Sequence, residues 1–199
     1  MREKKLKEAF ETKNGIIKMA DISAIPMYYR DVQKLIKQKV IEKIRNGYYQ
    51  RCYENRSTGE ASIIASLFQD GVICMYSALF YYNYSDRVPM TWDIAVDKNT
   101  SKARFNLKYP SVHPHYMKKS QLEYGVITVE IEGCKLNIFD RDRLMCECMM
   151  YMKKMDKELF NKAIQGYVSD NKKNISNLLE YARKRRVNRK IRDIIGVWL

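Results

Sequence analysis

Apolar residues recur at helical spacing near the start of the chain. Residues 2–13 place Leu6 and Phe10, with Ala9 beside them, on one side of a helix whose other side is charged. A shorter helical pattern follows at residues 18–23. We therefore expect the chain to begin with two short amphipathic helices.

A third helical pattern begins at Pro26. Proline suits the first turn of a helix, where its missing N–H would have no partner. Val32, Leu35 and Ile36 then recur at i, i+3 and i+4, which defines one buried stripe with Tyr28 near it. Successive helical residues are about 100° apart, so the polar side chains fall on the opposite, outward face. That face carries Arg30, Gln33, Lys34 and Lys37, with Tyr29 at its N-terminal corner.

A hairpin pattern follows this helix. Residues 40–51, VIEKIRNGYYQR, have β-branched and aromatic residues on both sides of Asn46 and Gly47, a pair that tolerates the positive φ values of a type I′ turn. Arg45 lies at the tip and Lys43 on the first strand. Three helices and a hairpin in this order predict a winged helix-turn-helix, in which the last helix enters the major groove and the hairpin contacts phosphate or the minor groove.

This arrangement predicts a DNA-binding surface. A basic helix face alone is usually just solvated, and Asn-Gly hairpins occur in every class of protein, so only their combination in one basic segment favours DNA. The first polar residues of the helix are expected to donate to base edges or phosphates. The last cation of the helix and the cations of the hairpin are expected to contact phosphates. The first group is Arg30, Gln33 and Lys34; the second is Lys37, Lys43 and Arg45; Tyr29 lies beside them.

Residues 53–61 contain Asn, Ser, Thr and Gly without periodicity and predict a linker. It would separate a domain at residues 1–52 from a second at residues 62–199. The second domain begins with two helices broken at Asp70, the later one including Ile73.

Strand patterns come next in this second domain. They are TWDIAV, VHPHYM, GVITVEI and CKLNIF, and the last two form an antiparallel pair across Glu132 and Gly133. An acid-initiated helical pattern from Asp140 and three further helices complete the chain. We expect an α+β fold: an N-terminal winged helix-turn-helix plus a C-terminal mixed domain with a small, mainly antiparallel sheet and several helices.

The positive charge is concentrated at both ends of the chain. The net charge is +14; residues 1–52 carry 13 Lys and Arg against 6 Asp and Glu, residues 168–199 carry 9 against 3, and residues 53–167 are balanced at 15 against 14. Such clustering implies a polyanionic partner for at least one end. The C-terminal cluster is either a solvated helix end or a second patch for phosphate or an acidic protein. It consists of Arg183, Lys184, Arg185, Arg186, Arg189 and Lys190.

Motifs for catalysis or metal binding are not recognisable in the sequence. The 5 cysteines are an odd set in mostly apolar surroundings, which favours free thiols in a reducing compartment and no zinc site. His113 and His115 flank Pro114 and have no obvious acid, base or nucleophile partner in the sequence. Phosphate-binding glycine loops, catalytic triads and apolar runs of the roughly 20 residues that span a bilayer are also missing. We expect a cytoplasmic protein without catalytic residues, metal or other cofactor.

The chain resembles the AbiEi antitoxins of bacterial abortive-infection toxin–antitoxin systems over nearly its whole length, including the N-terminal winged helix, and three segments of the second domain carry the resemblance. They are residues 71–98, residues 136–168 and residues 178–196, which include a helix with Ser77, Ala78 and Leu79 and a closing LLEYAR helix. One departure is Glu147, where this resemblance leads us to expect Asp.

The resemblance implies a two-part protein. Its N-terminal domain would bind inverted repeats in double-stranded DNA upstream of its own operon and repress it. Its C-terminal domain would neutralise a cognate nucleotidyltransferase-like toxin, without a stable complex being required. Two half-sites imply paired binding on DNA. The sequence shows no heptad or obvious exposed apolar face that specifies a dimer, so we expect a monomer in solution and no membrane partner.

Two other functional classes remain open at this point. A ligand-responsive winged-helix regulator would use the second domain as a small-molecule sensor. An enzyme acting on nucleic acid would need an ordered acidic or nucleophilic pocket in that domain. The neighbouring gene distinguishes a ligand-responsive regulator from an antitoxin, because an antitoxin requires a toxin gene beside its own.

Overall fold

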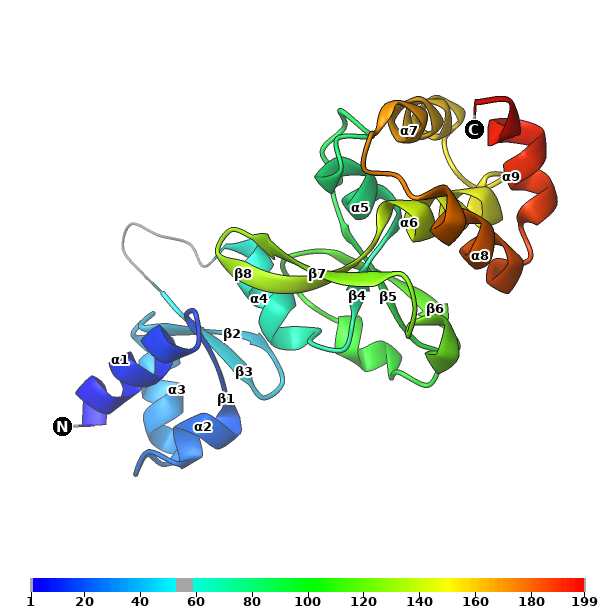
Figure 1. Ribbon diagram of the computed structural model, residues 1–199. Helices are drawn as coiled ribbons and strands as arrows, with labels where there is room; N and C mark the ends of the chain where they lie inside the picture. Colours follow the sequence, from blue (N-terminus) through cyan, green and yellow to red (C-terminus); the bar gives the residue numbers. More distant parts are fainter. Residues whose placement is uncertain (1, 53–58, 199) are drawn as a thin grey trace. The chain divides into compact units, whose positions relative to one another are not determined.

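The computed structural model describes residues 2–52 and 59–198, which form two compact units (Figure 1). The N-terminal unit comprises Met1–Gln69, Lys102–Pro110 and Glu130–Lys135. The C-terminal unit comprises Asp70–Ser101, Ser111–Val129 and Leu136–Leu199. Most of the linker expected at residues 53–61 lies outside the described residues.

The N-terminal unit contains short helices and a three-stranded sheet. The strands lie in the order β1-β3-β2, and both pairings are antiparallel. In chain order the elements are α1 (Arg2–Thr12), β1 (Ile16–Lys18), α2 (Met19–Ser23), α3 (Tyr29–Lys37), β2 (Ile41–Arg45), β3 (Tyr48–Arg51), α4 (Glu60–Leu67) and the 3₁₀ helix η1 (Lys102–Phe105).

The core of this unit confirms the expected helix faces. Leu6, Phe10 and Val32 are buried, whereas Leu35 and Ile36 are partly buried and pack against the same core. The sheet, α2 and the turn after α2 contribute the rest of the cluster. Its further buried members are Ile17, Ile22, Ile25, Ile41 and Tyr49.

α3 begins at Tyr29, so the expectation that it starts at Pro26 was wrong. The backbone of Tyr28 is extended, and its N–H donates to the Asp31 carboxylate at 3.0 Å. This bond satisfies an N–H that the helix leaves without a partner. Tyr28 consequently lies outside the helix and is 73% exposed, not near the buried stripe as predicted.

The hairpin of β2 and β3 is confirmed, but its turn is not of type I′. A type I′ turn needs positive φ at both central residues, and here Gly47 has φ +80° while Asn46 is not in the left-handed region. The register shifts between Lys43, which faces Tyr49, and Arg45, which faces Tyr48. The Gly47 carbonyl accepts the Met19 N–H at 2.8 Å, so the turn is attached to the start of α2.

α4 belongs to the N-terminal unit, which differs from the expected division of the chain. Five of its eight residues are apolar, none of the eight is exposed, and Ala61, Ile63, Ile64 and Leu67 are buried. A helix without an exposed side needs cover on most sides. Contact with β1 and stacking of Phe105 on the neighbouring Phe68, with ring centroids 5.3 Å apart, are part of that cover.

The C-terminal unit holds most of a five-stranded sheet and a group of helices. The strands lie in the order β6-β5-β4-β8-β7. The elements are β4 (Val72–Ile73), α5 (Met75–Tyr81), β5 (Trp92–Asp97), β6 (Val112–Met117), η2 (Lys119–Gln121), β7 (Val126–Ile131), β8 (Cys134–Phe139), α6 (Arg141–Tyr151), α7 (Lys157–Ser169), α8 (Ile175–Arg185), α9 (Asn188–Ile195) and η3 (Gly196–Trp198).

This sheet is mixed, and not mainly antiparallel as expected. β4 is antiparallel to β5 but parallel to β8, and β5 is parallel to β6. Long connections between these strands permit the parallel pairings, which a tight hairpin could not make. β7 and β8 are adjacent and joined through Glu132 and Gly133, with φ of 50° and 75°. Ile73 lies in β4 and not in a helix, since the β-branched pair with Val72 forms a short strand before α5.

α6 is the central helix of this unit (Figure 1). It contacts α5, α7, α8 and α9 and is buried around most of its circumference. Met145, Met149 and Met155 are in the core, as are Tyr82 and Tyr84, which follow α5. The chain is thus an α+β protein. Within the described part of it, helices of the length and apolar character needed to cross a membrane are not found.

Candidate nucleic-acid interface

The outward face of α3 carries the predicted basic side chains. Arg30, Lys34 and Lys37 are exposed and Gln33 is half-buried, while Val32 on the opposite face is fully buried. At about 1.5 Å per residue, the seven steps from Arg30 to Lys37 cover roughly 10 Å along the helix axis. A row of this length fits within the major groove of B-DNA, which is about 12 Å wide.

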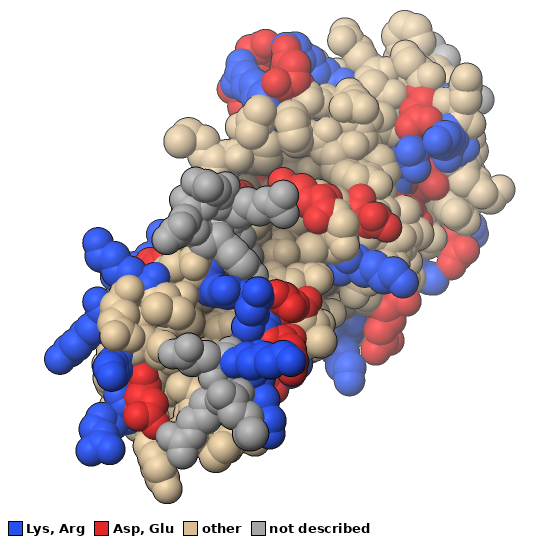
Figure 2. All heavy atoms as spheres, turned by 90° about the vertical axis from the view of Figure 1, so that its left-hand side faces the viewer, with Lys and Arg blue, Asp and Glu red and all other residues tan. Residues whose placement is uncertain are grey.

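These cations are not neutralised within the described part of the chain. None of Arg30, Lys34 and Lys37 forms a salt bridge or a side-chain hydrogen bond with another described residue. The nearby Asp31 carboxylate accepts the Tyr28 N–H instead. In Figure 2, Lys and Arg outnumber Asp and Glu over the visible surface of the lower, N-terminal part of the molecule. The α3 face therefore presents positive charge that an anionic partner can contact.

Two tyrosines lie at the N-terminal end of α3. Tyr29, which was predicted there, is 65% exposed, and Tyr28, which was not, is 73% exposed. A phenolic hydroxyl donates to phosphate oxygens and an aromatic ring stacks on sugars or bases. Tyr28 was missed because the helix was expected to start before it.

The two basic residues predicted on the hairpin have different environments. Lys43 is exposed. Arg45 is half-buried: its guanidinium lies over the Tyr48 ring, with Cζ 4.3 Å from the centroid, and its Nη1 donates to the Arg104 carbonyl at 3.3 Å. Arg45 is thus held within the N-terminal unit. Lys18 of β1, which the sequence did not indicate, is exposed, and its Nζ lies 5.8 Å from the same ring.

The basic residues predicted as a second patch, Arg183 to Lys190, do not form one exposed surface. Arg185 is buried and paired with Glu147, so it was wrongly placed on the surface. Lys190 is half-buried and donates to the Met149 carbonyl at 2.7 Å. The exposed cations are partly neutralised: Lys184 pairs with Glu180 at 2.6 Å and Arg189 with Asp193 at 3.5 Å, while Arg183 and Arg186 are also exposed.

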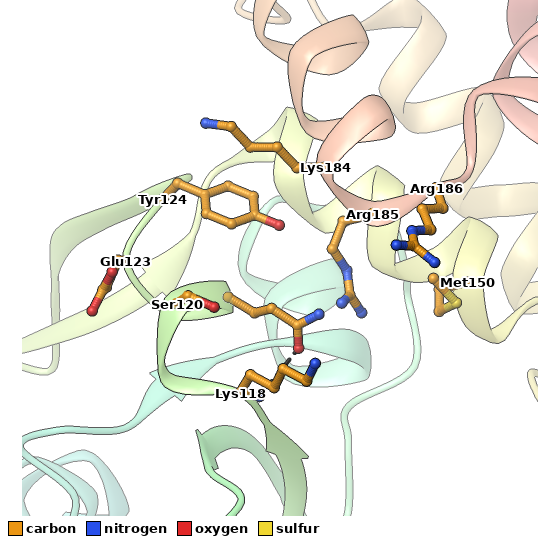
Figure 3. A pocket seen from close by; sticks show the side chains of 9 residues that line it. Lys118, Ser120, Glu123, Tyr124, Met150, Lys184, Arg185 and Arg186 are labelled. Carbon is orange, nitrogen blue, oxygen red and sulfur yellow. Dashed lines mark hydrogen bonds between the residues drawn. The ribbon is translucent and has the colours of Figure 1, made fainter.

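A cavity of about 800 Å³ opens beside this patch in the C-terminal unit. Figure 3 shows Arg185 directed into it from α8, with Lys118 below and Arg186 beside Met150. The charged residues of its lining are basic except for Glu123, which suits an anionic molecule, although the charge of Arg185 is balanced by Glu147. The residues that line it are Lys118, Ser120, Gln121, Glu123, Tyr124, Met150, Lys184, Arg185 and Arg186.

One cluster of acid and imidazole groups was missed in the sequence. The structure places the Asp93 carboxylate between His113 and His115, for which the sequence offered no acid partner. In the described residues, these three side chains form a group whose donor atoms all lie within 4.8 Å of one another. The spacing of the two histidines was the available signal, because residues i and i+2 of a strand share one face.

Comparison with known proteins adds no assignment to these surfaces. No protein-family model matches the chain, and no curated protein is significantly similar to it.

Proposed function

We propose that the protein is an autoregulatory DNA-binding antitoxin. Its N-terminal unit would be a winged helix-turn-helix that binds inverted repeats upstream of its own operon and represses transcription. The observation that carries this proposal is the outward face of α3, on which Arg30, Lys34 and Lys37 are exposed without neutralising partners among the described residues.

The order of elements supports the winged-helix assignment. α1, β1, α2, α3, β2 and β3 follow one another, and β1 joins the β2–β3 hairpin to make a three-stranded sheet. In a winged helix-turn-helix of this order, α2 and α3 form the helix pair, α3 enters the major groove and the hairpin is the wing. Packing of Val32 against the core directs the charged face of α3 away from the protein.

Different side chains would make different kinds of contact. Arg30, Gln33 and Lys34 lie on the N-terminal half of α3 and are assigned to base edges or nearby phosphates. Lys37 and Lys43 are assigned to phosphates, where each contact releases about one counterion. Tyr28 and Tyr29 would add hydroxyl contacts, whereas Arg45 is assigned to the stability of the hairpin.

The antitoxin part of the proposal rests on the resemblance of residues 71–98, 136–168 and 178–196 to AbiEi antitoxins. The C-terminal unit would counteract a nucleotidyltransferase-like toxin through its effect on cells and without a lasting complex. Inverted repeats imply that two molecules pair on DNA, while the protein alone would be a monomer.

Operator binding tests the first part. Fluorescence anisotropy with duplexes from the protein's own upstream region should give salt-dependent binding, and Arg30→Ala or Lys34→Ala should each cost about 1–3 kcal/mol where a base edge is contacted. Lys43→Ala should lower the slope of log K against log salt by about one unit. Lys7→Ala is the matched control, because it removes an equal charge from the exposed side of α1, where Lys7 pairs with Glu11 at 3.9 Å.

A triple variant gives the decisive result. Arg30→Ala, Lys34→Ala and Lys37→Ala together should abolish specific binding while circular dichroism and the unfolding midpoint stay unchanged. Operator affinity equal to that of the wild type would refute the assignment of α3.

Coexpression with the product of the neighbouring gene tests the antitoxin part. The wild type should restore growth to cells that produce the toxin, and the triple α3 variant should restore growth equally while no longer repressing a reporter fused to the upstream region. This separation is expected because the charged face and the resembling segments lie in different units. A neighbouring product without toxicity, or no rescue of growth, would contradict the proposal.

The basic cavity favours a second candidate, a ligand-responsive regulator. Lys118 and Arg186 on its wall could bind a phosphorylated or carboxylated metabolite. In that case an anionic metabolite should change operator affinity, and Lys118→Ala should remove the change without altering binding in its absence. Operator affinity that is indifferent to nucleotides and sugar phosphates would favour the antitoxin.

A further inference from the structure

The parallel pairing of β5 and β6 brings three potential metal ligands to one face of the sheet. Asp93 faces His113 and Ala95 faces His115 in the register of these strands. Side chains two residues apart on a strand share a face, so the carboxylate and both imidazoles project together. Ala95 leaves space beside His115 because its side chain is a single methyl group. Pro114 between the histidines is tolerated since β6 is an edge strand.

The donor atoms of these side chains converge. Asp93 Oδ1 lies 3.1 Å from His113 Nδ1 and 2.8 Å from His115 Nε2. Ligand atoms about 2.0–2.1 Å from a tetrahedral zinc ion lie roughly 3.3 Å from one another. The two distances are slightly shorter, and no pair in the cluster exceeds 4.8 Å. The His113 ring, which is 63% exposed, is the member of the cluster that can turn most freely towards a shared ion.

The burial of Asp93 supports a cation at this point. Its side chain is 3% exposed, and both imidazole contacts are made to the same oxygen, Oδ1. Oδ2 is buried and has no hydrogen-bond partner among the described residues. A cluster that served only to orient the histidines could distribute their bonds over both oxygens. A buried carboxylate oxygen without a hydrogen-bond partner is costly. A bound cation would compensate both oxygens at once.

We propose that Asp93, His113 and His115 bind a divalent transition-metal ion of the zinc class. Imidazole nitrogen and carboxylate oxygen are ligands that zinc accepts, whereas calcium and magnesium take oxygen ligands alone. His113 is 63% exposed and His115 12% exposed, so the fourth position opens towards solvent and would hold water. Three protein ligands and one open position are the arrangement in which zinc acts on a water molecule or a small ligand.

The backbone around Asp93 is fixed by the adjoining helix. The Asp93 N–H donates to Ser77 Oγ at 2.9 Å, and its carbonyl accepts the Cys74 N–H at 3.0 Å. Ser77 Oγ in turn donates to the Thr91 carbonyl at 3.3 Å. Such outer contacts hold the strand position of a ligand, and their loss weakens metal sites. The carboxylate is therefore preorganised, while the exposed His113 can adjust.

Zinc titration of the metal-stripped full-length protein tests this site. Calorimetry should give one zinc ion per chain, and the unfolding midpoint should rise with zinc and fall again with EDTA. The two histidines are the only ones in the sequence, so imidazole NMR signals report on this cluster alone and should shift in slow exchange. Cobalt as a spectroscopic probe should give visible bands of a nitrogen and oxygen site without the near-ultraviolet band of cobalt–thiolate bonding, which separates it from the cysteines.

Substitutions distinguish a built site from surface binding. His115→Gln and Asp93→Asn should weaken zinc binding at least about 100-fold, more than the loss of an outer contact would. His113→Ala, at the exposed position, is the variant least able to disturb folding and should also weaken binding. Asp97→Asn on the same strand is the matched control and should leave the affinity unchanged. Absence of zinc binding in the wild type would overturn the proposal, as would wild-type affinity in both His113→Ala and His115→Gln, or a cobalt–thiolate band.

Discussion

Replacement of Glu147 by glutamine removes a carboxylate that two arginines share inside the C-terminal unit. Arg185 Nη2 donates to Glu147 Oε2 at 2.7 Å, and Arg185 Nε lies 2.7 Å from Oε1 without the alignment of a hydrogen bond. Arg143 Nη2 lies 2.9 Å from the same Oε1. Arg143 and Glu147 are fully buried and Arg185 is 7% exposed. The group connects α6 with α8, so its loss should loosen the contact between these helices.

The expected cost follows from the burial of the two guanidinium groups. Removal of one partner from a buried ion pair costs about 3–5 kcal/mol, because the remaining charge stays buried without compensation. Glutamine keeps one acceptor oxygen but directs an NH₂ group at a cation. For a chain of 150–250 residues each kcal/mol corresponds to about 2–4 °C in Tm, so Tm should fall by roughly 6–20 °C. Cation–π contacts of Arg143 with Tyr124 and Phe139, at 4.3 and 4.8 Å, offset part of the loss.

Urea unfolding followed by circular dichroism measures this change. Glu180→Gln is the control, because Glu180 pairs with Lys184 at 2.6 Å on the surface of α8, where the two side chains are 51% and 45% exposed. A solvated i,i+4 pair contributes about 0.5 kcal/mol or less. The two substitutions therefore remove the same charge from an ion pair in opposite environments.

Equal losses of unfolding free energy in Glu147→Gln and Glu180→Gln would refute the expected cost of the unpaired buried arginines. A further variant separates charge from packing: simultaneous replacement of Arg143, Glu147 and Arg185 by Met, Leu and Met should be much less damaging than Glu147→Gln alone, since it leaves no buried charge without a partner. If the triple variant is the less stable of the two, the interactions of the charges themselves, and not their unpaired burial, determine the stability of this group.

Two further predictions concern other contacts. Arg45→Ala should lower the unfolding free energy by about 1–2 kcal/mol, because the Arg45 side chain stacks on Tyr48 and donates a hydrogen bond. The same substitution should leave the salt slope of operator binding unchanged. A reduced slope would contradict the internal role of Arg45. For Asp170, partial burial raises the pKa, but hydrogen bonds from Tyr84 and Arg141 outweigh it and lower the pKa overall. The stabilisation by the Asp170 carboxylate is present above the unfolded pKa of about 3.9 and is lost as pH falls through the lower folded pKa. The urea midpoint of Asp170→Asn should therefore depend less on acid pH than that of the wild type. Equal pH dependence of the two proteins would refute this.

The helices with one buried side could be predicted from the sequence. α1 and α3 place Leu6, Phe10 and Val32 in one core and their charged side chains in solvent. Their helical period could therefore be recognised in the sequence. α6 offered less information because it is covered by other helices on most sides. Its residues Arg143 and Glu147 are as deeply buried as its apolar ones, so polarity did not indicate which side faces solvent.

Short and non-local features could not be predicted in the same way. β1 has three residues, too few to show an alternating pattern, and it is defined by its pairing with β3. The environment of Arg45 depends on a carbonyl at Arg104, 59 residues later in the chain. Its sequence neighbours gave only the position at a hairpin tip, where an exposed arginine is the ordinary expectation.

The Asp93 cluster shows how much of a site can be predicted from the spacing of residues in the sequence. HPH within a strand pattern already places His113 and His115 on one side, but the partner is 20 residues away from the first histidine. Its place follows from the parallel register of β5 with β6, in which Asp93 faces His113. A register shifted by one residue would turn every side chain of β6 to the opposite face and leave the buried carboxylate without either imidazole. The metal proposal is therefore also a test of this register, because zinc binding through both histidines and Asp93 requires it.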